Sequence, residues 1–179
     1  MISERVFSNC LSLEKVIFEY PANIKTLKNH IFFNCPSLVK ISIPNYVEII
    51  DSHAFQECSS LKKILIPSSV SYINKYAFSF CTSLKQIIFE NPSSLKLIAN
   101  FSFYKCISLS KISLPLYISS IGKNAFGECL SLKQITIPNL VKSIGENALQ
   151  GCTSLEKIEL KSKNVSIGEN AFPVITEII

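Results

Sequence analysis

The sequence predicts a column of stacked coils built from tandem repeats, and three observations predict it. Seven cysteines recur every 23 or 25 residues along the 179-residue chain. Each cysteine is followed by a serine two residues later and by a leucine three residues later, and alternating apolar residues then lead to a proline in most copies. The cysteines are Cys10, Cys35, Cys58, Cys81, Cys106, Cys129 and Cys152.

The alternating segment predicts one short strand in each repeat. Ile64 and Ile66 are separated by a single residue, and Ile135 and Ile137 repeat that spacing. β-Branched residues with a period of two are typical of a half-buried strand. The proline that follows, such as Pro67, has no amide donor and predicts the end of the ladder.

The second half of each repeat predicts a tight turn followed by a helical turn. Residues that tolerate a positive φ follow the last isoleucine, namely Asp51, Asn74, Gly122, Gly145 and Gly168. The Ala-Phe-x-x-Cys segment that follows is too short for an independent α-helix. We therefore expect a single 3₁₀ or helical turn that directs the phenylalanine into the core.

One complete copy illustrates the expected core. Its inward positions combine the cysteine, the leucine, the isoleucines and the phenylalanine of the repeat. The predicted buried residues of this copy are Cys58, Leu61, Ile64, Ile66, Ile73 and Phe78.

Two repeats are longer by two residues, and the extra residues fall just before the proline. These segments are 18–21 and 89–92, each beginning with Phe-Glu and ending with Pro. A block of three repeats consequently recurs every 71 residues, from Cys10 to Cys81 to Cys152. This spacing predicts duplication of a three-repeat block whose insertions bulge from one edge.

The segment from Cys58-Ser59-Ser60-Leu61 to Ala77-Phe78 resembles the BspA-like leucine-rich repeats, and the likeness extends over essentially the whole chain. The resemblance implies an α/β fold: a right-handed leucine-rich-repeat solenoid, or horseshoe, with a parallel β-sheet on its concave face and short 3₁₀ or helical turns on its convex side. We expect residues 1–179 to form a single solenoid of about eight repeats of 23–25 residues, with no separate cap domain. The resemblance also implies a non-catalytic binding role, including adhesion at the cell surface.

The composition argues against other classes of protein. The 18 Lys and Arg against 13 Asp and Glu are dispersed, which does not favour nucleic-acid binding. No long uncharged apolar segment predicts a transmembrane span. The sequence contains no Ser-His-Asp set, no glycine-rich phosphate loop and no acids paired at a fixed spacing. We therefore expect neither an enzyme nor a cofactor. With no signal peptide visible, we expect a cytoplasmic protein with free thiols, and the alternative is the cell surface.

The cysteines and histidines do not predict a metal site. Zinc sites require closely spaced cysteine pairs, so we expect a buried column of thiols, with neighbouring Cα atoms roughly 5 Å apart and thus within disulfide range. His30 and His53 share one repeat position and should stack, but the column continues with Tyr76, Phe101 and Asn124. This mixture indicates a variable rim position without a third ligand.

The outward-facing strand residues form the predicted binding surface. Lysine commonly precedes the first core isoleucine, and an aliphatic residue often stands between the two core positions. We expect a protein partner to bind here, with the lysines steering towards an acidic surface. The alternatives are an intracellular regulatory scaffold, a polyanion or anionic-membrane binder, and a merely solvated face. The predicted partner-binding residues are Lys15, Lys40, Lys63, Leu65, Ile88, Lys111 and Lys157.

The repeat register continues into both ends of the sequence. Ile2, Val6 and Phe7 fall in core columns, whereas Ile175 falls in the cysteine column and Ile178 in the leucine column. Exposed apolar columns of this kind favour association. We therefore expect a homo-oligomer, most simply a two-fold dimer, with Phe172, Ile175 and Ile178 at its interface.

Overall fold

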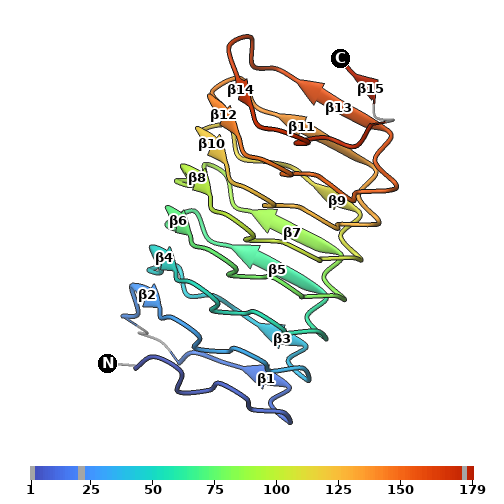
Figure 1. The fold of residues 1–179 in the computed structure, drawn as a ribbon. Coiled ribbons are helices and arrows are strands. Elements are labelled where there is room, and N and C mark those ends of the chain that lie inside the picture. The colour runs from blue at the N-terminus through green and yellow to red at the C-terminus, as the bar shows by residue number, and fades with distance from the viewer. Residues whose placement is uncertain (1–2, 20–22, 175–176) are drawn as a thin grey trace.

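The chain winds into a column of stacked coils (Figure 1). The structure is a computed structural model that describes residues 3–19, 23–174 and 177–179. All strand pairs are parallel among the described residues, and each strand pairs with its counterpart in a neighbouring coil. The predicted parallel-sheet solenoid is therefore confirmed.

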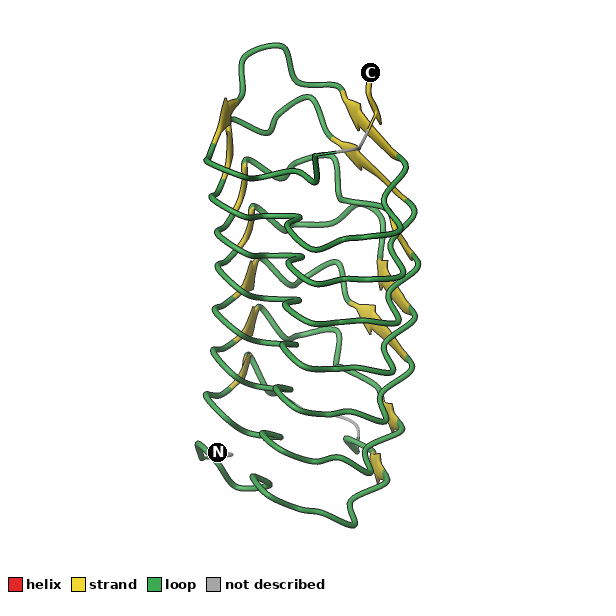
Figure 2. Ribbon diagram, turned by 45° about the vertical axis from the view of Figure 1, so that its right-hand side comes forward, coloured by secondary structure: helices red, strands yellow, loops and turns green. Residues whose placement is uncertain are grey.

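Most coils contain two strands rather than the single strand that we predicted. Figure 2 shows the two stacks of strands on different sides of the column, with turns between them. The first stack contains β1 (Lys15–Val16), β3 (Lys40–Ile41), β5 (Lys63–Ile66), β7 (Gln86–Phe89), β9 (Lys111–Ile112), β11 (Gln134–Ile137), β13 (Lys157–Leu160) and β15 (Glu177–Ile178). The second stack is a continuous seven-stranded sheet of β2 (Thr26–Leu27), β4 (Ile49–Ile50), β6 (Tyr72–Ile73), β8 (Leu97–Ile98), β10 (Ser120–Ile121), β12 (Ser143–Ile144) and β14 (Ser166–Ile167).

The prediction of a 3₁₀ or helical turn is wrong, because the described residues contain no helix. Backbone amides in the turn alternate between two kinds of acceptor. Those of His53 and Phe55 donate to carbonyls of the next coil, whereas those of Ala54 and Gln56 donate three residues back within their own coil. A helix needs every amide for its own ladder. Half of these amides instead join neighbouring coils.

The positive φ angles of the turn lie two residues later than predicted. His53, Tyr76 and Asn124 adopt φ angles of 59°, 60° and 50°. The prediction at Asp51, Asn74 and the three glycines is therefore wrong. At Gly122 and Gly168, a Cβ would lie 2.6 Å and 2.5 Å from a backbone nitrogen of the preceding coil. These glycines permit close approach of two backbones, which is a different use of the missing side chain.

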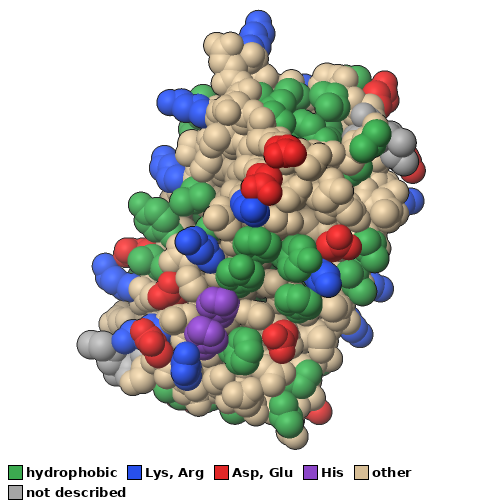
Figure 3. All heavy atoms as spheres, in the orientation of Figure 1, with side chains coloured by type: hydrophobic (Ala, Val, Ile, Leu, Met, Phe, Trp, Pro, Cys, Tyr) green, Lys and Arg blue, Asp and Glu red, His purple; other side chains and the backbone are tan. Residues whose placement is uncertain are grey.

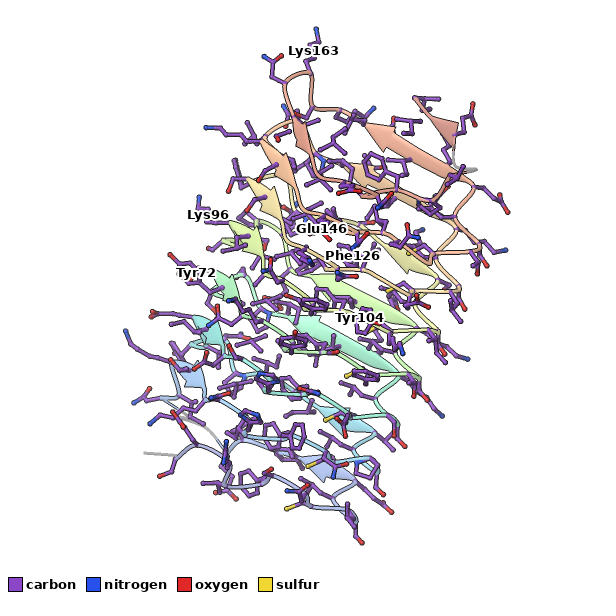
Figure 4. The ribbon with its side chains drawn as sticks, in the orientation of Figure 1. Tyr72, Lys96, Tyr104, Phe126, Glu146 and Lys163 are labelled. Atoms are coloured by element: carbon purple, nitrogen blue, oxygen red, sulfur yellow. The ribbon has the colours of Figure 1, made fainter. Side chains whose placement is uncertain are left out.

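The core lies between the two strand stacks and the turns. All six residues predicted to be buried in the copy that starts at Cys58 are buried. Phenylalanines form a stacked column through the core, with centroids 5.0 Å apart for Phe55 and Phe78 and 5.3 Å apart for Phe78 and Phe103. Phe126 continues this column inside the coils (Figure 4). Phe7 extends it at the other end by stacking on Phe32.

The last strand departs from the predicted register. β15 places Ile178 opposite Ile158, and not in the column of Leu155. The segment from Asn170 to Glu177 is three residues shorter than the equivalent segment from Asn147 to Lys157. Strand β15 therefore begins three residues sooner than the repeat period predicts. The predictions for Ile2 and Ile175 lie outside the described residues.

Candidate binding face

The first strand stack presents a row of lysines to solvent, and we call the outward side of this stack the lysine face. Lys63 and Leu65 point outward because Ile64 and Ile66 alternate with them and point inward. The pairing places Lys15 opposite Lys40 and Leu65 opposite Ile88. The five predicted lysines are exposed, Leu65 is exposed, and Ile88 is half-buried.

The lysines of this face keep their charges available. Within the described ranges, ion pairs join Lys25 to Glu48, Lys123 to Glu146 and Lys161 to Glu159. None of these pairs contains a lysine predicted for the binding surface. No ion pair among the described residues therefore neutralises these lysines, although Lys157 lies opposite Glu177 across the sheet and helps to lower the pKa of Glu159.

An open groove of about 680 Å³ crosses the lysine face at β9 and β11. Lys111, Gln134 and Thr136 line its strand side. Leu116 and Tyr117 line its other side and are 68% and 54% exposed. Exposed apolar side chains around a concavity favour contact with another molecule.

The residues after the strand-ending prolines are the part of this surface that our prediction missed. The regular copy has Ser68 and Ser69 after its proline, whereas Leu116 and Tyr117 stand at the corresponding positions two coils later. Tyr46 occupies the position of Ser69 in an earlier coil. The sequence already shows these replacements of serine by leucine or tyrosine, and they would have indicated apolar side chains on this surface.

Charges at the edge of the groove are already paired. Lys161 lies 2.5 Å from Glu159, and the Thr136 hydroxyl donates to the same carboxylate at 3.0 Å. The hydrogen bond from Lys161, followed by that from Thr136, lowers the pKa of Glu159 from its usual value. Glu159 therefore stays ionised and offsets Lys161, but not the lysines of β1 to β9.

A column of stacked rings lies on the turn side of the solenoid. As predicted, His30 and His53 stack, with centroids 4.4 Å apart. Tyr76 and Phe101 continue the column at 5.0 Å and 4.8 Å. Figure 3 shows the two histidines beside an apolar patch on this side. The rings are nearly parallel, and stacking of each ring on the next contributes to the stability of the column.

Burial lowers the pKa of His30, and the neighbouring charges of His53 and then Arg5 act in the same direction. The neutral imidazole is consequently favoured at this position. Among residues 3–19, 23–174 and 177–179, no group of three or more His, Cys, Asp or Glu side chains is placed to hold a metal ion. The histidine pair is thus part of the ring column.

The cysteines form a buried ladder with a specific hydrogen-bond partner. All seven are free thiols, six are buried, and Cys10 is partly exposed. Each of the six buried thiols donates to the carbonyl of a core phenylalanine in the preceding coil, as Cys106 does to Phe78 at 3.2 Å. Burial raises the pKa of Cys58, Cys106 and Cys129 well above its usual value. The thiolate, which is the reactive form, is therefore disfavoured.

The residues predicted for an oligomer interface do not form one cluster of exposed side chains. Phe172 is half-buried against the core, and Ile178 is 49% exposed. Val174, which was not predicted, is fully exposed. Ile175 lies outside the described residues.

The coils and their cysteine–leucine repeats define a repeat protein of the leucine-rich class, and comparison with known families gives the same assignment. A family model described as a BspA type leucine-rich repeat region of six copies matches residues 1–94 and again residues 89–178. The chain therefore belongs to the BspA-type leucine-rich repeat family. None of the curated proteins matches the chain.

Solved structures of bacterial leucine-rich repeat proteins resemble this fold. TpLRR from T. pallidum is 32% identical, with a TM-score of 0.61, over 74% of this chain and 68% of that one. A protein from Eubacterium ventriosum is 25% identical, with a TM-score of 0.76, over 88% of this chain and 44% of its own. A leucine-rich cell surface protein from Faecalibacterium prausnitzii is 18% identical, with a TM-score of 0.50, over 93% of this chain and 75% of its own.

No helix in the described part of the chain is long and apolar enough to cross a membrane.

Proposed function

We propose that this solenoid is a non-catalytic interaction module whose lysine face binds an acidic protein surface. The observation that carries the proposal is the row of exposed lysines, which form no ion pair within the described part of the chain, beside exposed apolar side chains. Lysines attract and orient an acidic partner, whereas buried apolar contact supplies most of the affinity. Leu65, Leu116 and Tyr117 provide such contact area on the same face.

A protein partner fits this surface better than a polyanion does. A polyanion would be held by the lysines alone, so its binding would fall steeply with salt. The exposed aliphatic and aromatic side chains would then remain in water without a role. Their position within the lysine row favours a partner that has both apolar and acidic groups.

We further propose display at the cell surface as the setting for this binding. The support is the similarity to a leucine-rich cell surface protein of Faecalibacterium prausnitzii, together with membership of the family. The buried thiols are compatible with export because their raised pKa values slow oxidation. Biotinylation of intact cells by a membrane-impermeant reagent, followed by detection of the chain, tests this location, and labelling only after lysis would contradict it.

The binding proposal is tested by comparing two charge-reversed variants on an affinity column. One variant replaces Lys40, Lys63 and Lys111 with glutamate. The control variant replaces Lys75, Lys142 and Lys163, which are exposed and lie off the lysine face. Both change the net charge equally.

We expect proteins from the native cell to be retained by the wild type and the control but lost from the first variant. Retention should persist when salt is raised to physiological strength or above. Equal retention by both variants would contradict the proposal. Binding of heparin or anionic vesicles that disappears with modest salt, without any retained protein, would favour the polyanion alternative.

A further inference from the structure

The lysine face contains two hollows of the same construction, separated by 71 residues. The first has a volume of about 290 Å³ and the second about 240 Å³. Their central tyrosines, Tyr46 and Tyr117, are 52% and 54% exposed. The shared lining pairs are Phe18 with Phe89, Glu19 with Glu90, Ser42 with Ser113, Ile43 with Leu114, Pro44 with Pro115, and Tyr46 with Tyr117.

The two long coils explain why the hollows occur at these places. Each hollow lies between a coil with the two-residue insertion and the coil that follows it. The described ends of the longer coils, Phe18-Glu19 and Phe89-Glu90, line one side of the hollows, and the next coil, which is of normal length, lines the other side. The tyrosine of the normal coil stands in the hollow. The repeated geometry therefore follows from the duplicated three-coil block.

The two hollows offer the same chemistry. Phenylalanine, proline and an aliphatic side chain supply an apolar lining, and the tyrosine adds an aromatic wall with a hydroxyl group. Lys40 lines the first hollow, and the equivalent Lys111 lines the larger groove that adjoins the second hollow. The second hollow opens directly onto the larger groove, because both include Tyr117 and Leu116.

Each lining also contains a glutamate, Glu19 or Glu90, and the carboxylate of Glu90 accepts a hydrogen bond from the amide of Ser68. An apolar anchor therefore fits each hollow, and acidic groups next to the anchor would face the lysines of the strands.

We propose that the two hollows bind one extended acidic segment of a partner protein, each receiving one apolar side chain. This inference rests on the proposed protein-binding function of the lysine face. Adjacent strands of a sheet lie about 4.8 Å apart, so equivalent points three coils apart are separated by about 14 Å. An extended chain advances about 3.4 Å per residue and returns to the same side every second residue. Anchors four residues apart therefore match the spacing and face the same way.

A helical segment does not match the same two hollows. A helix rises 1.5 Å per residue, so about 14 Å corresponds to between nine and ten residues. At 3.6 residues per turn, a side chain nine residues away points to the opposite side, and one ten residues away is turned by about 80°. The spacing of the hollows thus selects an extended segment that runs along the column.

The test uses a short fluorescein-labelled acidic peptide with two phenylalanines four residues apart, followed by fluorescence anisotropy at low salt. Peptides with the phenylalanines three or five residues apart are the controls, because an odd spacing places the anchors on opposite sides of an extended chain. The protein variants are Tyr46→Ala and Tyr117→Ala. Tyr72→Ala is the matched control, since Tyr72 is similarly exposed but projects from β6 in the other sheet (Figure 4).

We expect the four-residue peptide to bind most tightly, and each hollow variant to weaken its binding by about tenfold. Tyr72→Ala should bind like the wild type. Equal affinity for the three peptides, no binding of the four-residue peptide, or normal binding by both hollow variants would overturn the inference.

The charge-reversed variant separates this inference from the broader proposal. If reversal of Lys40, Lys63 and Lys111 abolishes peptide binding while both tyrosine variants bind normally, the acidic-partner function stands and the paired hollows do not. If neither the charge reversal nor the tyrosine variants change binding, both proposals fail.

Discussion

The thiol of Cys81 donates a hydrogen bond to the backbone carbonyl of Phe55, 3.1 Å away in the preceding coil. The same carbonyl accepts the amide of Cys58. A buried carbonyl that lacks partners costs free energy, and the cysteine supplies a second donor within an apolar core. Valine or alanine could fill part of this space, but neither could donate. The recurrence of cysteine therefore reflects hydrogen bonding as well as packing.

Alkylation should distinguish Cys10 from the other thiols. We expect iodoacetamide to modify Cys10 rapidly in the folded chain, because that thiol is partly exposed. The six buried thiols should react only after unfolding, since burial both blocks access and, for Cys58, Cys81, Cys106 and Cys129, strongly raises the pKa.

Mass spectrometry of peptides from folded and denatured protein measures both stages. Denaturation without a reductant should yield seven modified cysteines. Cysteine pairs that stay unmodified at that stage would contradict free thiols.

Phe78→Ala should destabilise the fold by about 3–5 kcal/mol, because it opens a cavity between Phe55 and Phe103 in the ring column. Urea denaturation followed by circular dichroism measures the change. Phe78→Leu is the control and should cost less, because it retains most of the buried volume. A loss below about 1 kcal/mol for the alanine variant would show that Phe78 is not a core residue.

Stability should decrease as the pH falls below about 6.5. The pKa of His30 is lower in the folded chain than in the unfolded chain, chiefly because of burial. Between the two pKa values the unfolded state therefore binds more protons, which favours unfolding. The charges facing His30 are those of His53 and Arg5, and the opposing charge of Glu4 is a smaller influence.

His30→Phe should reduce this pH dependence while keeping the ring stack. Urea titrations at pH 5 and pH 8 give the free energy of unfolding for both proteins. An unchanged pH slope in His30→Phe would assign the dependence to other groups.

Reversal of Lys40, Lys63 and Lys111 to glutamate should leave the thermal midpoint nearly unchanged. These side chains are exposed and make no ion pair among the described residues, and surface substitutions of that kind usually change stability by less than about 0.5 kcal/mol. Differential scanning calorimetry checks this expectation. A large loss of stability would indicate that the lysines support the sheet and would weaken their assignment to binding.

The 179-residue chain, expressed by itself, should form a homo-oligomer. Val174, Ile178 and Ile179 each expose apolar surface in the last coil, and such surface favours association. Sedimentation equilibrium at tens of micromolar should give a multiple of 20.0 kDa. Ile178→Asp should shift the mass towards the monomer. A strict monomer for the unmodified chain would refute this prediction.

The repeat period predicted the coil and its core because each inward residue recurs in a fixed column. Phe78, Ile64 and Cys58 are buried as expected. The local turn was harder to predict, because the φ angle of His53 depends on hydrogen bonds to the next coil. Such bonds have no counterpart in one repeat considered alone. The same holds for Gly122. We predicted that it forms a turn, but it allows the backbones of two neighbouring coils to approach closely, which one repeat alone does not show.

The surface, too, was predictable in one part and not in another. Period-two alternation was sufficient to place Lys40 and Lys63 on the outside of the sheet. The hollows at Tyr46 and Tyr117 each lie between a long coil and the coil of normal length that follows it. A sequence shows the extra length as an insertion, but the hollow beside it becomes visible only when the coils are stacked.

The alternating amides of the turn restrict how a protein of this kind can diversify. An insertion of one residue within a turn would exchange, in that coil, the amides that bond to the next coil with those that close the turn. Both long coils carry their two extra residues outside the turn, just before the strand-ending proline. Length can therefore be added at the corner before the proline without disturbing the bonds of the turn, and both hollows of the lysine face lie beside that corner.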